Sequence, residues 1–461
     1  MNVSIRAVPA TPAAPRHRRC ADHPTGPSGP GSSADAPSAP RTASTPRLDR
    51  HRRPRRRGAP TGHHRCAQRT AIFDEEKPMH NRRTFMLGAT AAAAALGLAA
   101  CGGEGAGSGG PDPDAPPSEQ TVGVAMPTQT YERWVADGNN IKEGLEGKGF
   151  TVDMQYADDD IPTQQQQIDQ MINSGVSVLL IASIDGASLS AQLDAAAAAG
   201  IPVVAYDRLL TDSENVDFYV TFDNYKVGVN QANALLYGLG LLDESFEPAD
   251  DAPEGPLNVE LFAGSLDDNN AHLFWDGAID TLQPYFDDGT LEVLSGQMDI
   301  DQAATQRWEQ ETAQKRMETL LTTHYNGGEE LAGVLAPADP LSRGIINALQ
   351  NTGLGPTIDE GLPIVTGQDA EIASIKLIAD GVQHSTIFKD TRDLADQAIV
   401  AAESILTGGE PEANDTETYD NGAKVVPSYL LEVQMVLESN YEEILVDSGY
   451  YTEEQVEAGQ L

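Results

Sequence analysis

The chain has few cysteines and, over most of its length, few basic residues. Its 461 residues include three cysteines, and none follows Cys101, so neither a disulfide nor a cysteine nucleophile is expected beyond that point. From Cys101 onward there are 13 Lys and Arg against 64 Asp and Glu, a net charge of −51 with His neutral. This balance excludes nucleic-acid binding through a basic face and argues against adhesion to anionic lipid headgroups.

Histidine is also scarce in this part of the sequence. His272, His324 and His384 lack the spacing of a metal site, and the sequence contains neither an H-E-x-x-H motif nor a phosphate-binding loop. We therefore expect no metal. An enzymatic function is open as an alternative, because a carboxylate pair such as Asp268 with Asp369 can act as general acid and base in glycoside hydrolysis.

Residues 1–78 differ sharply in composition from the rest of the chain. They hold 15 of the 30 Lys and Arg but only 6 of the 70 Asp and Glu, and they have no periodic apolar pattern. Such a segment cannot bury enough apolar surface to offset the entropy lost on ordering. We expect it to be disordered and to be an upstream extension rather than part of the working protein.

Residues 79–101 have the pattern of a lipoprotein signal peptide. An Arg-Arg pair precedes the largely apolar residues 85–100, and small residues lead up to Cys101. The apolar stretch is short for a membrane span and suited to an export signal. Because such a signal works from the true N-terminus, we expect translation to start at Met79. We expect Cys101 to carry a lipid that anchors the protein to the outer face of the cell membrane.

Residues 102–119 are rich in Gly, Pro and Asp, which predicts a flexible tether between the anchor and the folded part. A formal G-x-G-x-x-G occurs here at Gly105, Gly107 and Gly110. No expected strand precedes it, so it fails the structural condition for a dinucleotide site. We therefore expect no cofactor.

After residue 119, short apolar segments alternate with helix-length amphipathic segments. The expected strands are 121–126, 150–157, 176–183, 201–206, 216–222, 257–264, 291–297, 331–337, 362–368, 384–389 and 425–431. The expected helices are 131–148, 163–174, 187–199, 225–240, 270–284, 302–322, 341–352, 370–380 and 391–407. Apolar strands separated by helices indicate parallel sheets covered on both faces. We predict an α/β fold of two doubly wound lobes, 120–224 with 390–424 and 225–389 with 425–461.

Polar side chains follow nearly every expected strand. In doubly wound sheets ligands bind beyond the carboxyl ends of the strands, so these side chains are candidates for a site. The scarce cations support this interpretation, because Arg133, Arg208 and Lys389 all lie at such ends. We expect Asp207 to pair with the adjacent Arg208, and Arg343 to face solvent.

The chemistry of this edge suits a sugar. Asp and Asn oxygens accept hydrogen bonds and Arg offers five donors, so a neutral ligand with many hydroxyls fits the inventory. Trp134 and Trp308 can lay an aromatic face against the C–H side of a sugar ring, or can pack in the core instead.

Several long motifs resemble the periplasmic monosaccharide-binding proteins of ABC importers. They are "YADDDIPTQQQQIDQMINSGVSVLLIASIDG", "IPVVAYDRLL", "YVTFDNYKVGVNQA", "GSLDDNNAHLFWDGA", "GQDAEIASIK", "STIFKDTRDLA" and "NGAKVVPSYLL", which follow one another from about Val122 to the C-terminus. The likeness is greatest to the multiple-sugar (aldose) branch, which stands beside the xylose-binding proteins.

This resemblance implies two lobes joined by a hinge of three crossing strands, which close over one monosaccharide. The implied sugar-binding residues are Arg133, Trp134, Asp207, Arg208, Asp268, Asn270, Trp308, Asp339, Asp369 and Lys389. The chain has Ala338-Asp339 where xylose binders have Asn-Asp, which puts strict xylose specificity in doubt. The implied partners are an aldose such as glucose, galactose, xylose or arabinose, an ABC permease and, in addition to transport, a membrane sensor kinase.

Overall fold

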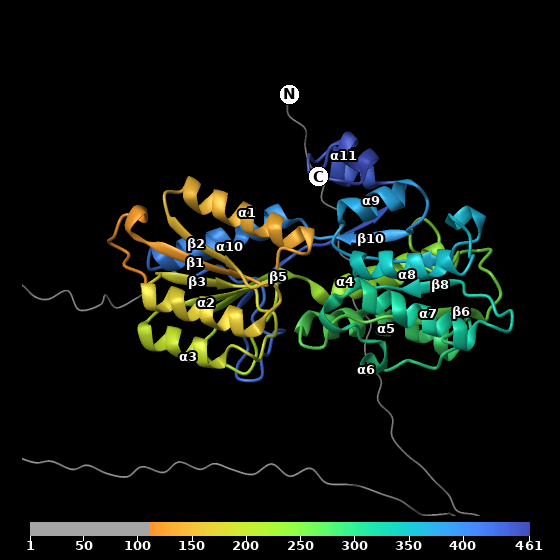
Figure 1. The fold of residues 1–461 in the computed structure, drawn as a ribbon, viewed down its shortest axis with the longest axis horizontal. Helices are drawn as coiled ribbons and strands as arrows, with labels where there is room; N and C mark the ends of the chain where they lie inside the picture. Colours follow the sequence, from red (N-terminus) through yellow and green to blue (C-terminus); the bar gives the residue numbers. More distant parts are fainter. Residues whose placement is uncertain (1–109) are drawn as a thin grey trace, which may run out of the picture. The chain divides into compact units, whose positions relative to one another are not determined.

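A computed structural model describes residues 110–461, which form two α/β lobes (Figure 1). The expected disordered segment, the signal segment and Cys101 lie outside the described residues. Every helix within 110–461 is too short or too polar to cross a membrane.

The first lobe is built around a six-stranded parallel sheet. Its strands are β1 (Thr121–Met126), β2 (Thr151–Tyr156), β3 (Val178–Ile181), β4 (Val203–Tyr206), β5 (Phe218–Phe222) and β11 (Ser428–Leu431), in the order β11-β5-β4-β3-β1-β2. Its helices are α1 (Glu132–Gly147), α2 (Ile161–Ser174), α3 (Ser190–Ala199) and α10 (Thr391–Leu406), with a 3-10 turn η1 (Pro117–Glu119) before β1. Helices α1 and α10 cover one face of the sheet and α2 and α3 the other (Figure 1).

The second lobe contains a four-stranded parallel sheet and an antiparallel pair. The sheet has the order β7 (Leu291–Glu292), β6 (Leu257–Leu261), β8 (Gly333–Leu335) and β9 (Ile364–Val365), and the pair is β10 (Ser385–Phe388) with β12 (Gln434–Leu437). Its helices are α4 (Asn224–Gly238), α5 (Asn269–Asp287), α6 (Ile300–Ala303), α7 (Gln310–His324), α8 (Asp339–Asn351), α9 (Ile372–Ala379) and α11 (Glu453–Ala458). Two 3-10 turns, η2 (Gln306–Trp308) and η3 (Ile358–Glu360), and a short π-helix, η4 (Glu442–Val446), complete it.

Strand β1 shows why the sheets lie between helices. Val122, Val124 and Met126 are fully buried in one hydrophobic cluster, and the alternate residue Ala125 is fully buried in another. Because successive side chains of a strand point to opposite faces, a strand covered on both sides must be apolar throughout. Burying a large aliphatic side chain contributes about 1.5–3 kcal/mol.

Within the described residues, the chain passes between the lobes three times, from β5 to α4, from β10 to α10 and from β11 to β12. Two of these crossing segments bond directly, because the Asp223 N–H donates to the Leu431 carbonyl at 3.0 Å. The predicted α/β fold of two lobes with a three-strand hinge is confirmed.

Aspartates turn several strand exits into helix starts. Asp223, Asp268 and Asp390 are the N-cap residues of α4, α5 and α10, and each side chain accepts a backbone N–H of the first turn at 2.9–3.0 Å. A carboxylate at this position satisfies a backbone donor that has no partner inside the helix. Two of these caps, Asp223 and Asp390, lie at crossings of the hinge.

The C-terminal boundary of the first lobe lies later than the sequence predicted. We placed residues from 425 onward in the second lobe, but β11 pairs in parallel with β5 of the first sheet. The third crossing therefore follows Leu431. The next strand, β12, was not predicted at all, and its antiparallel pairing with β10 departs from the expected all-parallel arrangement.

The expected helix 302–322 is interrupted. It consists of α6, the turn η2 and α7, because Arg307 and Trp308 adopt left-handed φ angles of 56° and 57°. This conformation is unfavourable for large L-residues, and it persists where the surroundings impose it. The interruption places Trp308 beside the hinge-facing edge of the second lobe.

The predicted tether does not extend to residue 119. The Gly110 N–H donates to the Val176 carbonyl at 3.3 Å, and Pro113 lies against Gly408. Residues 110–119 therefore pack along the first lobe.

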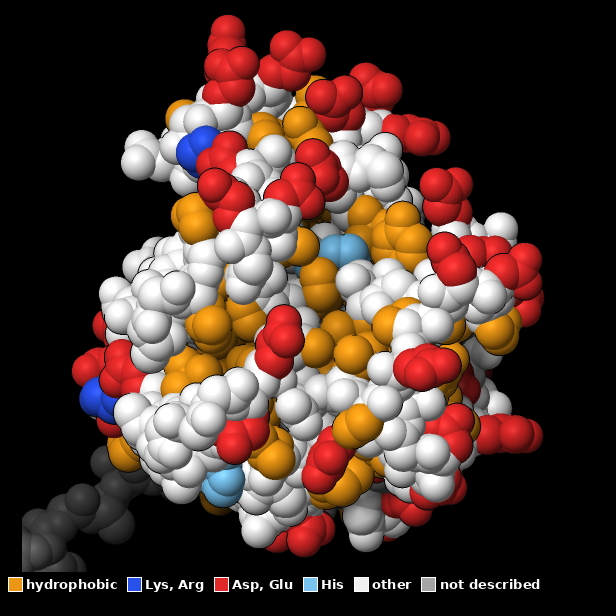
Figure 2. All heavy atoms as spheres, turned by 90° about the vertical axis from the view of Figure 1, so that its right-hand side faces the viewer, with side chains coloured by type: hydrophobic (Ala, Val, Ile, Leu, Met, Phe, Trp, Pro, Cys, Tyr) orange, Lys and Arg blue, Asp and Glu red, His pale blue; other side chains and the backbone are white. Residues whose placement is uncertain are grey.

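The surface is predominantly acidic. Figure 2 faces the second lobe, where Asp and Glu side chains surround the rim of the view and Lys and Arg are few. This distribution agrees with the charge balance of the sequence.

Candidate functional site

A pocket lies between the two lobes, next to the hinge. It encloses about 460 Å³ between protein atoms, including the part open to solvent. Its lining residues are Tyr131, Arg133, Trp134, Asp207, Arg208, Asp268, Asn270, Phe274, Trp308, Ala338, Pro340, Gln368, Asp369, Glu371 and Lys389. Nine of the ten residues predicted from the sequence are in this list, and Asp339 is not.

Arg133, in the first turn of α1, connects the two sides of the pocket. Its Nε and Nη2 donate to Asp137 Oδ2 at 3.1 and 2.9 Å, and Nη2 lies 2.8 Å from Asp207 Oδ1. Its Nη1 reaches Asp369 Oδ1 of the second lobe at 3.5 Å. Burial alone would lower the pKa of Arg133, but the three carboxylates outweigh it and raise the pKa well above its ordinary value.

Asp137 holds Arg133 from behind the pocket wall. It lies four residues further along α1, is fully buried, and accepts a 2.6 Å hydrogen bond from the Tyr206 hydroxyl. Burial raises the pKa of Asp137 to about 6, although Arg133 and Tyr206 stabilise its ionised form. These bonds fix the Arg133 guanidinium in one orientation, in which it also reaches Asp207 and Asp369 of the pocket lining.

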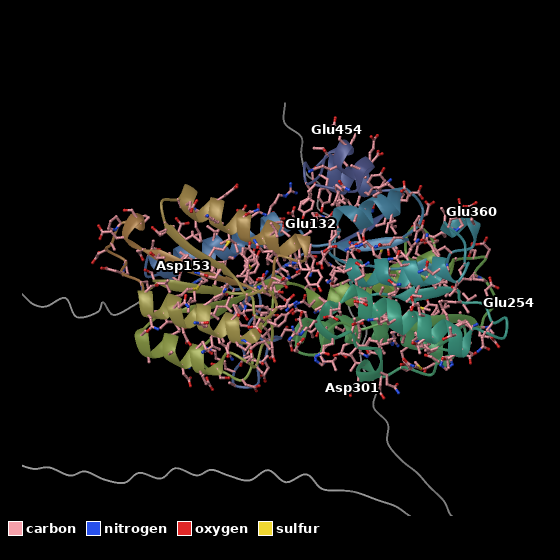
Figure 3. The ribbon with its side chains drawn as sticks, viewed as in Figure 1. Glu132, Asp153, Glu254, Asp301, Glu360 and Glu454 are labelled. Carbon is pink, nitrogen blue, oxygen red and sulfur yellow. The ribbon has the colours of Figure 1, made fainter. Side chains whose placement is uncertain are left out.

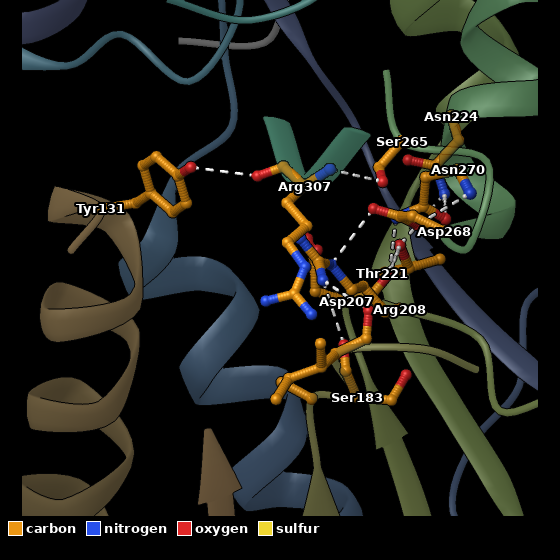
Figure 4. Close-up of polar contacts among 12 residues, drawn as sticks. Tyr131, Ser183, Asp207, Arg208, Thr221, Asn224, Ser265, Asp268, Asn270 and Arg307 are labelled. Carbon is orange, nitrogen blue, oxygen red and sulfur yellow. Dashed lines mark hydrogen bonds and ion pairs between the residues drawn. The ribbon is translucent and has the colours of Figure 1, made fainter. Parts of the chain in front are cut away.

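Asp207 and Arg208 do not pair with each other, contrary to the prediction. Asp207 pairs with Arg133, whereas Arg208 Nε lies 3.1 Å from Asp268 Oδ2 of the second lobe (Figure 4). Arg208 Nη1 also donates to the Ser183 carbonyl at 3.1 Å. Adjacent side chains leave the end of β4 in different directions, and Asp207 has a left-handed φ of 59°.

The backbone of Asp207 is held by hydrogen bonds from both lobes (Figure 4). Its carbonyl accepts from the Tyr219 hydroxyl at 2.6 Å, from the Thr221 hydroxyl at 3.0 Å and from Asn270 Nδ2 at 2.8 Å. Asn270 belongs to α5 in the second lobe and also accepts from Asn224 at 3.0 Å. Asn270 therefore joins the lobes at the floor of the pocket.

Lys389 follows β10 at the second crossing and is 3% exposed. Its Nζ lies 3.0 Å from Asp369 Oδ1 and 4.0 Å from Asp207 Oδ1. Burial alone would raise the pKa of Asp207, but the charges of Arg133, Lys389 and Arg208 outweigh it and lower the pKa below its ordinary value. Asp268 behaves differently, since burial raises its pKa more than Arg208 lowers it.

Aromatic rings form the remaining walls. Trp308 packs over Gly264, where any added Cβ would collide with the indole, and meets Phe274 edge to face at 6.3 Å between centroids. Trp134 is covered by guanidinium groups, with Arg133 at 4.4 Å and Arg208 at 5.2 Å from its ring centroid. Two cations therefore lie against the Trp134 ring, which we expected to meet a sugar.

Four buried polar atoms of the lining make no hydrogen bond within residues 110–461. Asp207 Oδ1 and Arg208 Nε are in ion pairs instead, whereas the Trp308 indole Nε1, a donor, and Gln368 Oε1, an acceptor, have no polar partner among the described residues. Buried polar atoms are nearly always paired in native proteins, and leaving one unpaired costs about 1–3 kcal/mol. A ligand that offers hydroxyl groups, which both donate and accept, would remove this cost.

Asp339 lies behind the pocket wall and not at its surface. It is fully buried at the first position of α8, where Oδ1 accepts from Gln383 at 2.9 Å and Oδ2 from the Glu371 N–H at 2.9 Å. Burial raises the pKa of Asp339 to about 8. Its neighbours Ala338 and Pro340 line the pocket in its place.

Arg343 does not face solvent freely, contrary to the prediction. Its Nη2 pairs with Glu371, which lines the pocket, and its Nη1 donates to the Ser374 hydroxyl at 3.0 Å. Burial raises the pKa of Glu371, and Arg343 counteracts that rise. Arg343 therefore supports the pocket wall.

The lining residues that the prediction omitted were only partly detectable in the sequence. Phe274 follows Asn270 by four residues on a helix, so it shares that face of α5. Glu371 and Gln368 flank the predicted Asp369. Tyr131 immediately precedes the "ERW" motif but lies before the helix begins, where periodicity gives no direction.

Every charged side chain of the lining is paired with a side chain of opposite charge. Arg133, Arg208 and Lys389 face Asp207, Asp268 and Asp369, and behind the wall Arg133 also pairs with Asp137 and Glu371 with Arg343. A net charge on the ligand would disturb this pairing, whereas neutral hydroxyls can bond to both kinds of group. Within 110–461, no cluster of His, Cys, Asp or Glu has the arrangement of a metal site.

Known proteins resemble the chain across both lobes. Residues 122–410 match the periplasmic binding protein domain. The chain is 52% identical over 336 residues to the multiple sugar-binding periplasmic receptor ChvE of Rhizobium radiobacter, covering 73% of this chain and 92% of the relative. It is 37% identical over 338 residues to the D-xylose-binding periplasmic protein of Escherichia coli strain K12, covering 73% and 93%.

Among solved structures, an ABC transporter solute-binding protein from Clostridium phytofermentans with bound β-D-glucose is similar. It is 45% identical, has a TM-score of 0.68, and the match covers 73% of this chain and all of that chain.

Proposed function

The chain belongs to the periplasmic binding protein domain family, and from that premise we propose that it binds a monosaccharide between its lobes and delivers it to an ABC permease. The names of two relatives support a sugar as ligand, since one binds multiple sugars and the other D-xylose. The glucose held by the similar solved structure supports an aldose.

One observation carries this proposal: the pocket between the lobes combines paired charges with buried polar atoms that have no partner among residues 110–461. The Trp308 donor and the Gln368 acceptor have no partner among the described residues, while cations and carboxylates from both lobes line the same space. A pyranose presents hydroxyls around its rim and C–H groups on its faces, so it matches both the polar groups and the rings of Trp308 and Phe274.

The expected affinity is micromolar. Each hydrogen bond between a sugar hydroxyl and a charged side chain contributes about 1.5–3 kcal/mol, and three cations and three aspartates are within reach. After the costs of ordering and association, three or four such bonds support a binding free energy of about −8 kcal/mol, a dissociation constant of about 1 μM.

Calorimetric titration tests the proposal. Purified protein titrated with glucose, galactose, xylose and arabinose should give saturable heat with at least one of them. Glucose 6-phosphate and glucuronate should bind much more weakly, because each adds charge to a pocket whose charges are already paired. Absence of binding across a wide panel of neutral aldoses would refute the assignment, and tighter binding of the charged sugars would refute the argument from charge.

The family works outside the cytoplasm, and we propose that a lipid on Cys101 holds this chain there. The support is the sequence, in which an apolar stretch and small residues lead to Cys101. The variant Cys101→Ser should move the protein from the membrane fraction to the soluble extracytoplasmic fraction. Ser108→Ala, seven residues after Cys101, is the control and should leave the protein in the membrane fraction; equal behaviour of the two variants would contradict the proposal.

The relatives are named as binding proteins, and we propose that this chain likewise does not transform its ligand. Asp268 and Asp369, the carboxylate pair considered for glycoside chemistry, are each paired with a cation. Recovery of unchanged sugar after long incubation is expected, and a new product would revive the enzymatic alternative.

A sensory role beside transport is supported by one observation, the word "receptor" in the name of the 52% identical relative. We propose that the loaded protein also docks on a membrane sensor kinase. The expected result is a sugar response that persists in a strain without the permease. Loss of the response in that strain would refute the sensory role and leave transport as the only proposed function.

A further inference from the structure

The first turn of α1 lies at the mouth of the pocket and contacts the second lobe on two sides. Tyr131, Arg133 and Trp134 line the pocket, whereas Glu132, which lies between them, is outside the lining. The Tyr131 hydroxyl donates to the Arg307 carbonyl at 3.0 Å (Figure 4). Figure 3 places Glu132 at the end of α1 that faces the second lobe.

Glu132 contacts two segments of the second lobe. Its Oε1 lies 2.6 Å from the Tyr451 hydroxyl, and both carboxylate oxygens lie 3.4 Å from the Ile372 N–H. Ile372 is the first residue of α9, so the carboxylate also faces the positive end of a helix dipole. A charge-assisted bond to a hydroxyl is about twice as strong as a neutral one.

Tyr451 belongs to the C-terminal segment 438–461, which follows β12. The preceding residue, Tyr450, fixes this segment to the second crossing of the hinge. Its ring meets Phe388 edge to face at 4.8 Å and lies 5.0 Å from the Arg392 guanidinium, and its hydroxyl lies 3.1 Å from Thr391 Oγ1. The two adjacent tyrosines thus connect the hinge to the mouth of the pocket.

Tyr451 has a second acceptor within its own lobe. Its hydroxyl lies 3.0 Å from the Ala370 carbonyl, next to the pocket residue Asp369. A hydroxyl has one hydrogen to donate, and the carboxylate of Glu132 is the stronger acceptor. If the lobes separate, the hydroxyl can turn to the Ala370 carbonyl and remain hydrogen-bonded. The free energy gained on closing is therefore the difference in strength between the bond to Glu132 and the bond to Ala370.

We propose that Glu132 and Tyr451 form a closure clasp, a positioning pair that favours the closed lobes and slows release of the ligand. Ligand contact and closure are coupled because Glu132 and Arg133 are adjacent in one helical turn, and because Tyr451 rests on the loop that carries Asp369. The readouts that use a sugar rest on the proposed function. The clasp acts only where it is stronger in the closed state than in the open one.

The test uses Tyr451→Phe, which removes the hydroxyl and keeps the ring. Its matched control is Tyr441→Phe in the same segment, because within residues 110–461 the Tyr441 hydroxyl hydrogen-bonds only to the neighbouring Glu442. Stopped-flow tryptophan fluorescence should show a dissociation rate about three- to tenfold higher for Tyr451→Phe, and calorimetry a dissociation constant raised by the same factor. The association rate and the melting temperature without ligand should stay near those of the parent protein.

Two further measurements keep the proposal refutable. Solution X-ray scattering without sugar should show a larger radius of gyration for Tyr451→Phe than for the parent or Tyr441→Phe. In the background of Glu132→Gln, Tyr451→Phe should change the dissociation rate by less than twofold, because the shared bond is already weakened. Scattering without sugar tests the clasp even if no sugar binds, whereas a parent protein that binds no aldose refutes the proposed function instead.

Parent-like release and scattering for Tyr451→Phe would overturn the clasp. An equal effect of Tyr441→Phe, or a full effect of Tyr451→Phe in the Glu132→Gln background, would do the same.

Discussion

Replacement of Arg208 by alanine should weaken ligand binding by about 2–4 kcal/mol. The side chain is 12% exposed and pairs with Asp268, whose carboxylate is 5% exposed. Truncation removes the charge-assisted bonds that the guanidinium offers a ligand, each contributing about 1.5–3 kcal/mol. It also leaves a buried carboxylate without its cation, which adds to the loss.

This free energy corresponds to a dissociation constant about 30- to 700-fold higher. Calorimetric titration with the best-bound aldose measures it directly. Arg208→Lys separates the causes, because lysine keeps the charge but not the planar fork, and it should restore only part of the affinity. Circular dichroism should confirm that each variant is folded, since Arg208 also bonds to the Ser183 carbonyl.

The control is Lys148→Ala. Lys148 is in the same lobe and pairs with Glu403 on the surface, where both side chains are 42% exposed. Exposed ion pairs contribute little, so the change in binding free energy should be less than about 0.5 kcal/mol. Arg343, which the sequence suggested as a neutral position, is unsuitable because it pairs with Glu371 of the pocket lining. Equal losses for Arg208→Ala and Lys148→Ala, or parent-like affinity for the former, would refute the assigned site.

Two further predictions concern individual groups. Trp308→Phe removes the unpaired indole donor and should raise the dissociation constant for the sugar about tenfold. The control Trp275→Phe, outside the pocket lining, should leave the dissociation constant unchanged. Equal dissociation constants for the two variants in calorimetry would show that the Trp308 Nε1 donates to no ligand. Asp339, with a folded pKa of about 8 against about 3.9 unfolded, binds a proton that the unfolded chain lacks, so its contribution is lost as pH rises through the folded pKa. Relative to Asp339→Asn, the parent should lose roughly 1 kcal/mol of unfolding free energy per pH unit between about pH 5 and about pH 8. Urea denaturation measures this free energy. A difference in unfolding free energy between parent and variant that does not change with pH would contradict the buried neutral carboxyl.

Most of the site could be predicted from the sequence because parallel strands end at one edge. Apolar runs revealed the strands, and polar residues that follow strands of the two parallel sheets, such as Asp207 after β4 and Asp369 after β9, line the pocket as this rule predicts. Asp339 shows the limit of this reasoning. It follows a strand as the others do, but it begins a helix whose first turn is buried, so its carboxylate bonds to Gln383 behind the wall.

Pairing was less predictable than position. Adjacency in sequence suggested that Asp207 and Arg208 bond to each other, yet the backbone at Asp207 is left-handed and the two side chains separate. Asp207 pairs with Arg133 of its own lobe, and Arg208 pairs with Asp268 of the second lobe. The break before α7 was missed for a related reason. No Gly or Pro marks the left-handed turn at Arg307 and Trp308, so the local pattern continued to read as helix.

The strand β12 was missed because it has only four residues, of which Gln434 is exposed and Val436 and Leu437 are buried. Its pairing with β10 comes from a contact between segments nearly fifty residues apart, which periodicity does not report. Periodicity likewise could not detect the contact of Tyr451 with Glu132, which is 319 positions away in the sequence.

The pairing of charges in the pocket has a consequence for the environments in which the protein can operate. Exposed charges are screened by dissolved ions over about 10 Å at 0.1 M ionic strength, but the ion pairs of the lining are buried and largely insulated from them. A neutral ligand that enters this space brings and removes no net charge. Affinity should therefore vary little between dilute and briny surroundings, even though the exterior carries a large excess of negative charge.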